Sequence, residues 1–319
     1  MKAFKEDDPN QSGQDDTYGI VISKYEGPWD IMQTWFGVPN QWGETGNGEL
    51  IPDFMTEEYL EALSFFKKLY DEGLVNEDFA VMDTAEWVTP INNGEAGVLV
   101  DVADQANRTQ EKLLERDSEL EGVIDVFGAV KGPHGLRTLP TAGYMGMFAI
   151  PKTTVKTEEE LREVLRFIDM LNDEEAQIIA NNGLEGRHFE MTESGEFKQI
   201  SAETPALYNE HQDLNQLQPY IPENRFYKEE MSPLIEKQEV VMKANEKIVV
   251  PNPAEALISD VYSQKGAQLD NIINDARIQF IVGQIDEDGL QEAISLWLSS
   301  GGQEYIDEIN QLYQEAGAE

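Results

Sequence analysis

Cysteine is absent from the 319 residues, and so is any run of about 18 apolar residues that would be long enough to cross a bilayer. The first absence excludes disulfides, thiol catalysis and a cysteine-linked lipid anchor on these residues. The second predicts that no segment of this chain inserts into a membrane. Met1 to Lys5 lead directly into a polar loop, so we expect no signal peptide at this end.

Basic residues are scarce, because 23 lysines and arginines stand against 62 acidic residues and leave a net charge of −39. Such a field repels phosphate backbones and anionic lipids, which predicts no nucleic-acid partner and no anionic membrane surface as a partner. Two interpretations of the charge stay open. It is either a solvated surface that keeps a secreted protein soluble, or an adaptation to an alkaline or saline exterior.

Familiar catalytic motifs are also missing. The sequence has no HExxH, GxSxG, GxxxxGK or GxGxxG, and its histidines, His134, His188 and His211, are too far apart to indicate a zinc site. Abundant carboxylates are compatible with the acid pair of a glycosidase, but no motif singles out one pair among so many. We therefore predict a binding protein and no enzyme. A glycoside-processing enzyme using paired carboxylates is the alternative, and a remnant without a ligand is a third hypothesis.

Residues 56–104 contain the clearest structural signals in the chain. Thr56 is a helix N-cap, apolar residues recur at helical spacing up to Tyr70, and Gly73 stands where a helix ends in a left-handed residue. A second short helix is expected at residues 84–92. With 40% hydrophobic residues, including 13 Phe, 11 Tyr and 5 Trp, the chain has enough apolar material for a core and for about two domains.

The apolar run at residues 96–102 predicts a strand buried on both faces, inside a sheet that helices cover on both sides. Asp101 and Asp104 stand at the carboxyl end of this strand, where open α/β sheets bind ligands. Further elements are expected as strands at 18–23, 123–130 and 143–151, and as helices at 105–116, 157–171, 173–180, 290–298 and 305–313.

Tryptophans gather in a region rich in glycine and proline. Sugars present flat C–H faces flanked by hydroxyls, so aromatic platforms next to carboxylates and amides are typical of saccharide sites, although the same side chains also suit core packing. Trp29 and Trp42 are the favoured candidates because they lie next to Pro and Gly in apparent loops. Trp35 and Trp87 complete the set of candidate ligand-binding tryptophans.

The loop at residues 8–17 carries oxygen ligands at the spacing of a calcium loop. The candidate metal ligands are Asp8, Asn10, Ser12, Gln14 and Asp16. The bidentate Glu of an EF-hand is missing, because the twelfth position is Gly19. A structural Ca²⁺ and an Asx-rich turn before a strand are the two interpretations.

Four separated motifs, in order, resemble the family 1 extracellular solute-binding proteins, the sugar-capturing components of bacterial ABC importers. They are "TEEYLEALSFFKKLYDEGLVNEDF" with "NNGEAGVLVDV", then "GYMGMFAIPKT", "NDEEAQIIANNGLEGRHFE" and "SSGGQEYIDEINQLYQ". The resemblance implies an α/β, periplasmic-binding-protein-like fold of type II, similar to maltose-binding protein, with two lobes that close on a ligand by hinge motion. Some sugar-binding members hold a structural calcium in a loop similar to residues 8–17. Thr17 replaces the acidic residue that closes that site.

The resemblance also implies a role and a cellular place. The chain would capture an extracellular saccharide or oligosaccharide in a cleft between lobes and deliver it to ABC permease subunits, as a monomeric lipoprotein on the outer face of the cell membrane. Met1 falls inside the family's sequence, so we expect an incomplete N-terminal lobe.

The family's pattern divides the chain into residues 1–19 as the calcium-type loop, 20–142 as the C-terminal-lobe domain, 143–250 as the hinge crossing with the remaining part of the N-terminal lobe, and 251–319 as C-terminal helices. Residues implied near the hinge and cleft are Tyr144, Glu185, Arg187 and His188. For His188, packing or helix capping remains an equal alternative.

Overall fold

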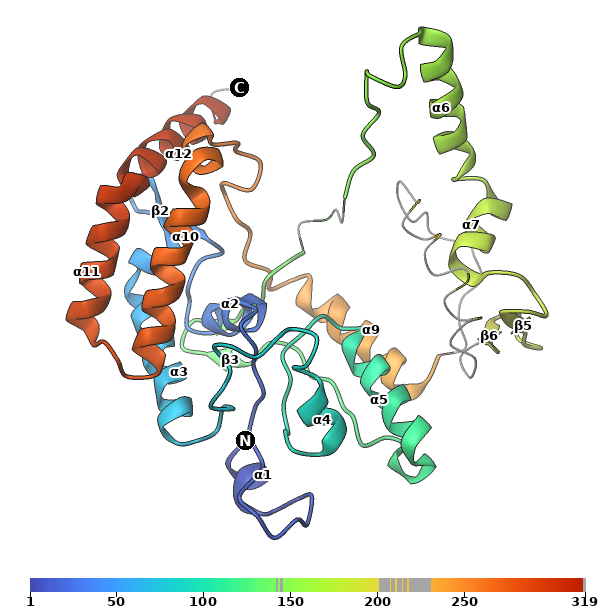
Figure 1. Cartoon of the computed structure of the whole chain (residues 1–319), viewed down its shortest axis with the longest axis horizontal. Helices are drawn as coiled ribbons and strands as arrows, with labels where there is room; N and C mark the ends of the chain where they lie inside the picture. Colours follow the sequence, from blue (N-terminus) through green and yellow to red (C-terminus); the bar gives the residue numbers. More distant parts are fainter. Residues whose placement is uncertain are drawn as a thin grey trace. The chain divides into compact units, whose positions relative to one another are not determined.

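The computed structural model describes residues 1–141, 143, 146–200, 207, 210, 214, 217 and 231–317. These residues form two compact units, one made of Met1–Ala142 with Leu234–Glu319 and the other of Gly143–Pro233. Figure 1 shows the chain coloured along its sequence. The first unit is called the large unit and the second the small unit below.

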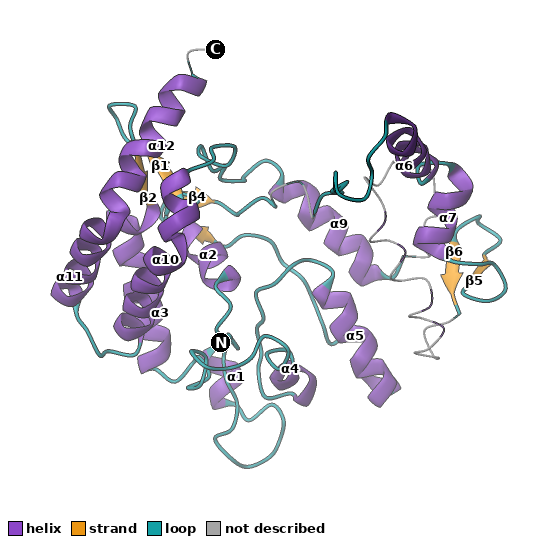
Figure 2. Cartoon of the chain, turned by 45° about the horizontal axis from the view of Figure 1, so that its top comes forward, coloured by secondary structure: helices purple, strands orange, loops and turns teal. Residues whose placement is uncertain are grey.

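The large unit is mainly helical, and its strands are short (Figure 2). Its helices are α1 (Lys2–Glu6), α2 (Gly27–Thr34), α3 (Glu57–Asp71), α4 (Thr89–Asn93), α5 (Gln105–Arg116), α9 (Pro233–Asn245), α10 (Asp260–Ile281), α11 (Glu287–Trp297) and α12 (Gln303–Ala316). Single turns are η1 (Asp53–Met55), η2 (Ser118–Leu120) and the π-helical η4 (Leu298–Gly302), and two antiparallel hairpins pair β1 (Trp42–Glu44) with β2 (Leu50–Pro52) and β3 (Lys131–Gly132) with β4 (Gly135–Leu136).

Helix α3 confirms the strongest local prediction. The Thr56 side chain accepts a hydrogen bond from the Tyr59 N–H, and Gly73 takes a left-handed conformation with φ of 64°. The buried face of α3 packs against α10, and α11 and α12 lie against α10 in turn (Figure 1). Leu63 and Phe66 of α3 meet Leu269 and Ile273 of α10 in one core.

The predicted strands at 18–23 and 96–102 are wrong as regular strands. Residues 18–22 instead lie between two extended segments, with isolated parallel bridges from Tyr18 to Ala96 and from Ile20 to Val75. The Asn76 amide then accepts from the Ile22 N–H and donates to the Ile22 carbonyl, both at 2.9 Å. The Asn76 side chain thus takes the place of the next backbone partner, and the backbone pairing of this segment ends at Ile22.

Two other expected strands are also wrong. Residues 123–130, and the described part of 143–151, have no strand pairing and are mostly exposed. Strand-forming residues become a strand only where another segment pairs with them, and no described segment does so here. The expected helix at 84–92 shortens to α4, which ends at Gly94 in the left-handed conformation.

The small unit contains α6 (Glu158–Met170), α7 (Glu174–Asn182) and the hairpin of β5 (Phe189–Met191) with β6 (Phe197–Gln199). The helix predicted at 157–171 is confirmed as α6, and it begins with a capping box in which Thr157 Oγ1 accepts from the Glu160 N–H and Glu160 accepts from the Thr157 N–H. In the part of the chain that the structure describes, no helix has both the length and the apolar character needed to cross a bilayer.

Candidate functional site

A pocket of about 470 Å³ opens in the large unit between α2, the β1–β2 hairpin with η1, and the helices α10 to α12. Every residue that lines it belongs to this unit. Aromatic side chains and carboxylates both line it, and the Tyr262 hydroxyl donates to Asp270 at 2.8 Å. This combination is typical of sites that hold a molecule with both apolar faces and hydroxyl groups.

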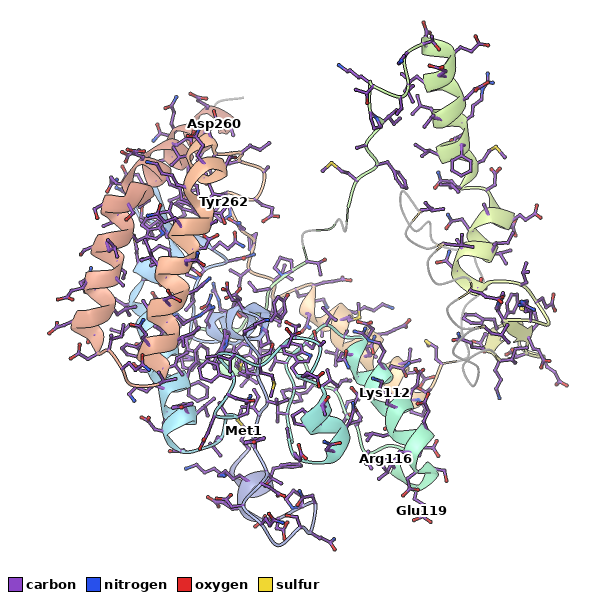
Figure 3. The ribbon with its side chains drawn as sticks, viewed as in Figure 1. Met1, Lys112, Arg116, Glu119, Asp260 and Tyr262 are labelled. Carbon is purple, nitrogen blue, oxygen red and sulfur yellow. The ribbon has the colours of Figure 1, made fainter. Side chains whose placement is uncertain are left out.

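The aromatic wall comes from five elements, β1, η1, α10, α11 and α12. Tyr262 stacks on Tyr305, with ring centroids 5.0 Å apart and an interplanar angle of 28°. Trp42 of β1 meets the same Tyr305 edge-on at 5.1 Å, and Trp297 meets Phe54 edge-on at 4.9 Å. Tyr262 lies in the first turn of α10 and keeps 41% of its surface exposed (Figure 3).

The π-helical turn η4 holds two of these rings in place. It separates α11, which ends at Trp297, from α12, which carries Tyr305. A Cβ on Gly302 would lie only 2.0 Å from Cε3 of Trp297, so only glycine lets the backbone lie against this ring. The glycine pair in the "SSGG" motif therefore shapes the pocket wall.

The polar wall is organised around Arg277, whose side chain is only 8% exposed. Its Nη2 lies 3.3 Å from Glu26 Oε1, and its Nη1 lies 3.6 Å from Asp30 Oδ1. Burial raises the pKa of Asp30 to about 6 although Arg277 opposes the shift. The pocket thus keeps a carboxyl group that titrates close to neutral pH.

Asp53 is the second perturbed carboxyl group. Its Oδ1 accepts from the Phe54 N–H at 2.7 Å, and its Oδ2 accepts from Gln33 Nε2 at 3.1 Å. Burial, followed by the negative charge of Asp30, raises the pKa of Asp53 to about 7. Gln33 is 4% exposed, and its Oε1 has no hydrogen-bond partner among the described residues. The pocket therefore contains a buried acceptor that a ligand hydroxyl can satisfy.

We expect Asp53→Asn to stabilise the protein above neutral pH. Folding raises the pKa of Asp53 to about 7. The free-energy cost of burying its negative charge is therefore absent below the unfolded-state pKa, grows as the pH rises, and is fully present only well above pH 7. The Asn amide keeps the bond to Phe54, and Gln33 can rotate its amide to accept from Asn Nδ2. Urea unfolding at pH 8 should show a gain of about 1 to 2 kcal/mol, allowing for partial exposure. An equal gain at pH 4 would contradict this origin.

Of the tryptophans predicted as ligand contacts, only Trp42 lines the pocket. Trp29 is buried in the core, 4.8 Å from Phe66 between ring centroids, Trp35 packs at the edge of the same core, and Trp87 is buried against Tyr25. These three tryptophans pack against other apolar side chains outside the pocket, and their role in ligand binding stays a prediction.

The two predicted aspartates lie away from this pocket. Asp101 Oδ1 accepts from the Val102 N–H, and burial raises the pKa of Asp101. Asp104 forms an exposed pair with Arg108 at 3.3 Å. Because residues 96–102 are not a regular strand, the strand end that was expected to present these carboxylates does not form.

Three predicted site residues belong to the small unit. Arg187 makes two hydrogen bonds to the Glu210 carboxylate, at 2.8 and 2.6 Å, and holds the pKa of Glu210 down to about 2, with help from His188. His188 is buried and accepts from the Leu184 N–H at Nδ1, so its Nε2 donates to Glu210 at 3.1 Å. Both side chains thus bind Glu210, while Glu185 is exposed. Tyr144 lies outside the described residues.

The predicted calcium loop forms a hydrogen-bonded turn. Asp16 Oδ1 accepts from Asn10 Nδ2 at 3.1 Å and from Ser12 Oγ at 2.9 Å, while both carboxylate oxygens of Asp8 accept from the N–H groups of Ser12 and Gly13. The Gln14 N–H donates to Ser12 Oγ. Across the described residues, no group of three or more His, Cys, Asp or Glu side chains is placed to hold a metal. Of the predicted ligand oxygens, Ser12 Oγ meets Asp16 directly, whereas Asn10 turns its Nδ2 to Asp16 and its Oδ1 to the Ser12 N–H.

Sequence reasoning missed Asp30, Asp53, Tyr262, Arg277 and Tyr305 as site residues. One signal was available for Arg277. It follows Leu269 and Ile273 on the buried face of α10, and a charged residue on an apolar seam indicates a buried ion pair. Tyr305 lay inside a quoted family motif but was interpreted only as part of a helix.

No family model matches the chain. It is 52% identical over 320 residues to "Lipoprotein LipO" of Bacillus subtilis (strain 168), covering 98% of this chain and 63% of that protein. It is 33% identical to the "Polygalacturonan/rhamnogalacturonan-binding protein YtcQ" of the same organism, covering 99% of this chain and 62% of that protein. The chain thus spans somewhat less than two thirds of the length of these relatives.

Solved structures share the fold at low identity. The Streptococcus pneumoniae ABC-transporter substrate-binding protein FusA in complex with kestose matches 99% of this chain and 67% of its own, with a TM-score of 0.65 and 17% identity. The alginate-binding protein AlgQ2, in a crystal structure without calcium ion, matches 98% of this chain and 66% of its own, with a TM-score of 0.60 and 14% identity.

These matches define the class as the two-lobe, periplasmic-type solute-binding fold, which confirms the predicted fold class. The matches to LipO and YtcQ, over somewhat less than two thirds of their length, agree with the resemblance to the family 1 extracellular solute-binding proteins that the four motifs indicated.

Proposed function

We propose that this chain carries a saccharide-binding site of an ABC importer's substrate-binding lipoprotein. The pocket of the large unit carries this proposal, because stacked aromatic rings, carboxylates and an unpartnered amide oxygen line the same cavity. Pyranose rings bind through their C–H faces on aromatic rings and through hydroxyl groups that donate to such acceptors. The names of YtcQ, FusA and AlgQ2, which refer to carbohydrate ligands, support the same class of ligand.

Calorimetry against a panel of oligosaccharides tests the proposal, and Tyr305→Leu tests the site. Tyr305 contacts both Tyr262 and Trp42, so its loss removes the centre of the aromatic wall. We expect binding of at least one oligosaccharide and at least tenfold weaker binding by the variant. Tyr25→Leu is the matched control, because Tyr25 packs on Trp87 outside the pocket. The absence of heat with every sugar would refute the proposal.

The importer context follows from the relatives. One is named a lipoprotein and a solved neighbour is named an ABC-transporter substrate-binding protein, which supports a place at the outer face of the membrane and permease subunits as partners. We propose that the chain acts as a monomer in this role, which light scattering can measure.

The alternative of a glycoside-processing enzyme has one feature in its favour. Asp30 and Asp53 have pKa values raised to about 6 and 7, as acid–base pairs require. The solved neighbours named AlgQ2, FusA and the Bifidobacterium longum protein are, however, called an alginate-binding, a substrate-binding and a solute-binding protein, which favours binding. Turnover of a chromogenic glycoside that Asp53→Ala abolishes would favour catalysis over binding.

We also propose that the loop at residues 8–17 binds a structural Ca²⁺ through Asn10, Ser12 and Asp16. Ser12 Oγ and Asn10 Nδ2 both lie within hydrogen-bond distance of Asp16 Oδ1, so rotation of the Asn10 amide would bring a third oxygen to the same place, and a bound cation stabilises only the folded loop. Millimolar Ca²⁺ should raise the melting temperature relative to a chelator, and Asp16→Ala should remove that increase. An increase that survives in the variant would place the ion elsewhere.

A further inference from the structure

Carboxylates outnumber cations in the pocket of the large unit. Glu26, Asp30, Asp53 and Asp270 line it, and Arg277 is the one cation among its described lining residues. Arg277 is already engaged by Glu26 and Asp30. An incoming carboxylate would lose its hydration without gaining a free cation, and it would be repelled by the pocket and by the net charge of −39.

The charged part of the same lining consists mainly of hydrogen-bond acceptors. The carboxylate oxygens and the unpartnered Oε1 of Gln33 all accept hydrogen bonds, while the guanidinium donors of Arg277 are directed to carboxylates. A ligand that satisfies these groups must bring donors. The hydroxyl groups of a neutral sugar do so, whereas an ionised uronic acid replaces one hydroxyl group per ring with a further acceptor.

From this charge and hydrogen-bond pattern we infer that the pocket selects neutral glycans and discriminates against uronic acids, an inference that rests on the proposed function. YtcQ is named for binding polygalacturonan and rhamnogalacturonan, and AlgQ2 for binding alginate. The inferred preference for neutral glycans would set this chain apart from those two proteins. The raised pKa values of Asp30 and Asp53 support it, because they show that further negative charge in the pocket is unfavourable. The aromatic wall contributes equally to both kinds of sugar and does not discriminate between them.

Calorimetry at pH 8 tests the inference with a matched pair of ligands, tetragalacturonate and its carboxyl-reduced form, beside a panel of neutral oligosaccharides. We expect the reduced form or another neutral glycan to bind at least tenfold more tightly than the uronate. A smaller preference, or tighter binding of the uronate, overturns the inference and leaves the proposed function standing. If no ligand binds, the proposed function itself is refuted, and this inference with it.

Charge-removing variants test whether the pocket causes the discrimination. Asp30→Asn and Asp53→Asn each remove one negative charge while preserving shape, so each should reduce the preference for the neutral ligand at least threefold. Glu292→Gln removes the same charge from an exposed position on α11 outside the pocket and should leave the preference unchanged. Equal effects of the three variants would show that the net charge of the protein, and not the pocket, is responsible, which contradicts the inference.

Discussion

Replacing Arg277 with methionine should lower the free energy of unfolding by about 3 kcal/mol at pH 8. The guanidinium is almost fully buried and faces Glu26 and Asp30, with Asp53 close enough for Arg277 to affect its pKa. Methionine fills a similar volume, so the loss comes mainly from the carboxylates that remain without a cation. Chemical denaturation at several pH values measures the effect.

The pH dependence separates charge from packing in this variant. Asp30 and Asp53, with pKa values raised to about 6 and 7, become neutral on acidification and no longer need a cation. The loss in Arg277→Met should therefore be much smaller at pH 5 than at pH 8. Lys265→Met is the control, because Lys265 pairs with Glu304 on the surface and should contribute less than about 1 kcal/mol. A loss that does not change with pH would indicate packing alone.

Local signals explain which parts of the fold could be predicted from the sequence. The cap at Thr56, the capping box of Thr157 with Glu160 and the left-handed Gly73 act within a few residues, so the helices they delimit form as expected. Strands depend on partners elsewhere in the chain. Residues 96–102 have the composition of a buried strand, but the structure pairs only their first residues, with the segment near Tyr18.

The site was harder to predict than the fold because its groups come from distant elements. Trp29 and Trp42 look equivalent in sequence and both are buried, yet only Trp42 also lines the pocket, since the tertiary fold decides which elements lie around the cavity. Asp30 and Asp53 are 23 residues apart, in α2 and η1, and the charge of Asp30 raises the pKa of Asp53 only because the chain folds them together. Among so many acidic residues, composition alone could not select them.

Gly302→Ala should destabilise the protein by about 2 to 3 kcal/mol and weaken saccharide binding, because the new methyl group would overlap the buried ring of Trp297. The φ of −62° at Gly302 suits alanine, so the loss would come from the contact and not from backbone strain. Gly46→Ala is the matched control, since a Cβ at that position would have no atom within 4 Å and the stability should be nearly unchanged. Combining Gly302→Ala with Trp297→Leu should cost less than the sum of the two single changes, because the shorter side chain vacates the space that the methyl group needs. Strict additivity in urea unfolding would mean that the ring and the π-helical turn do not depend on each other.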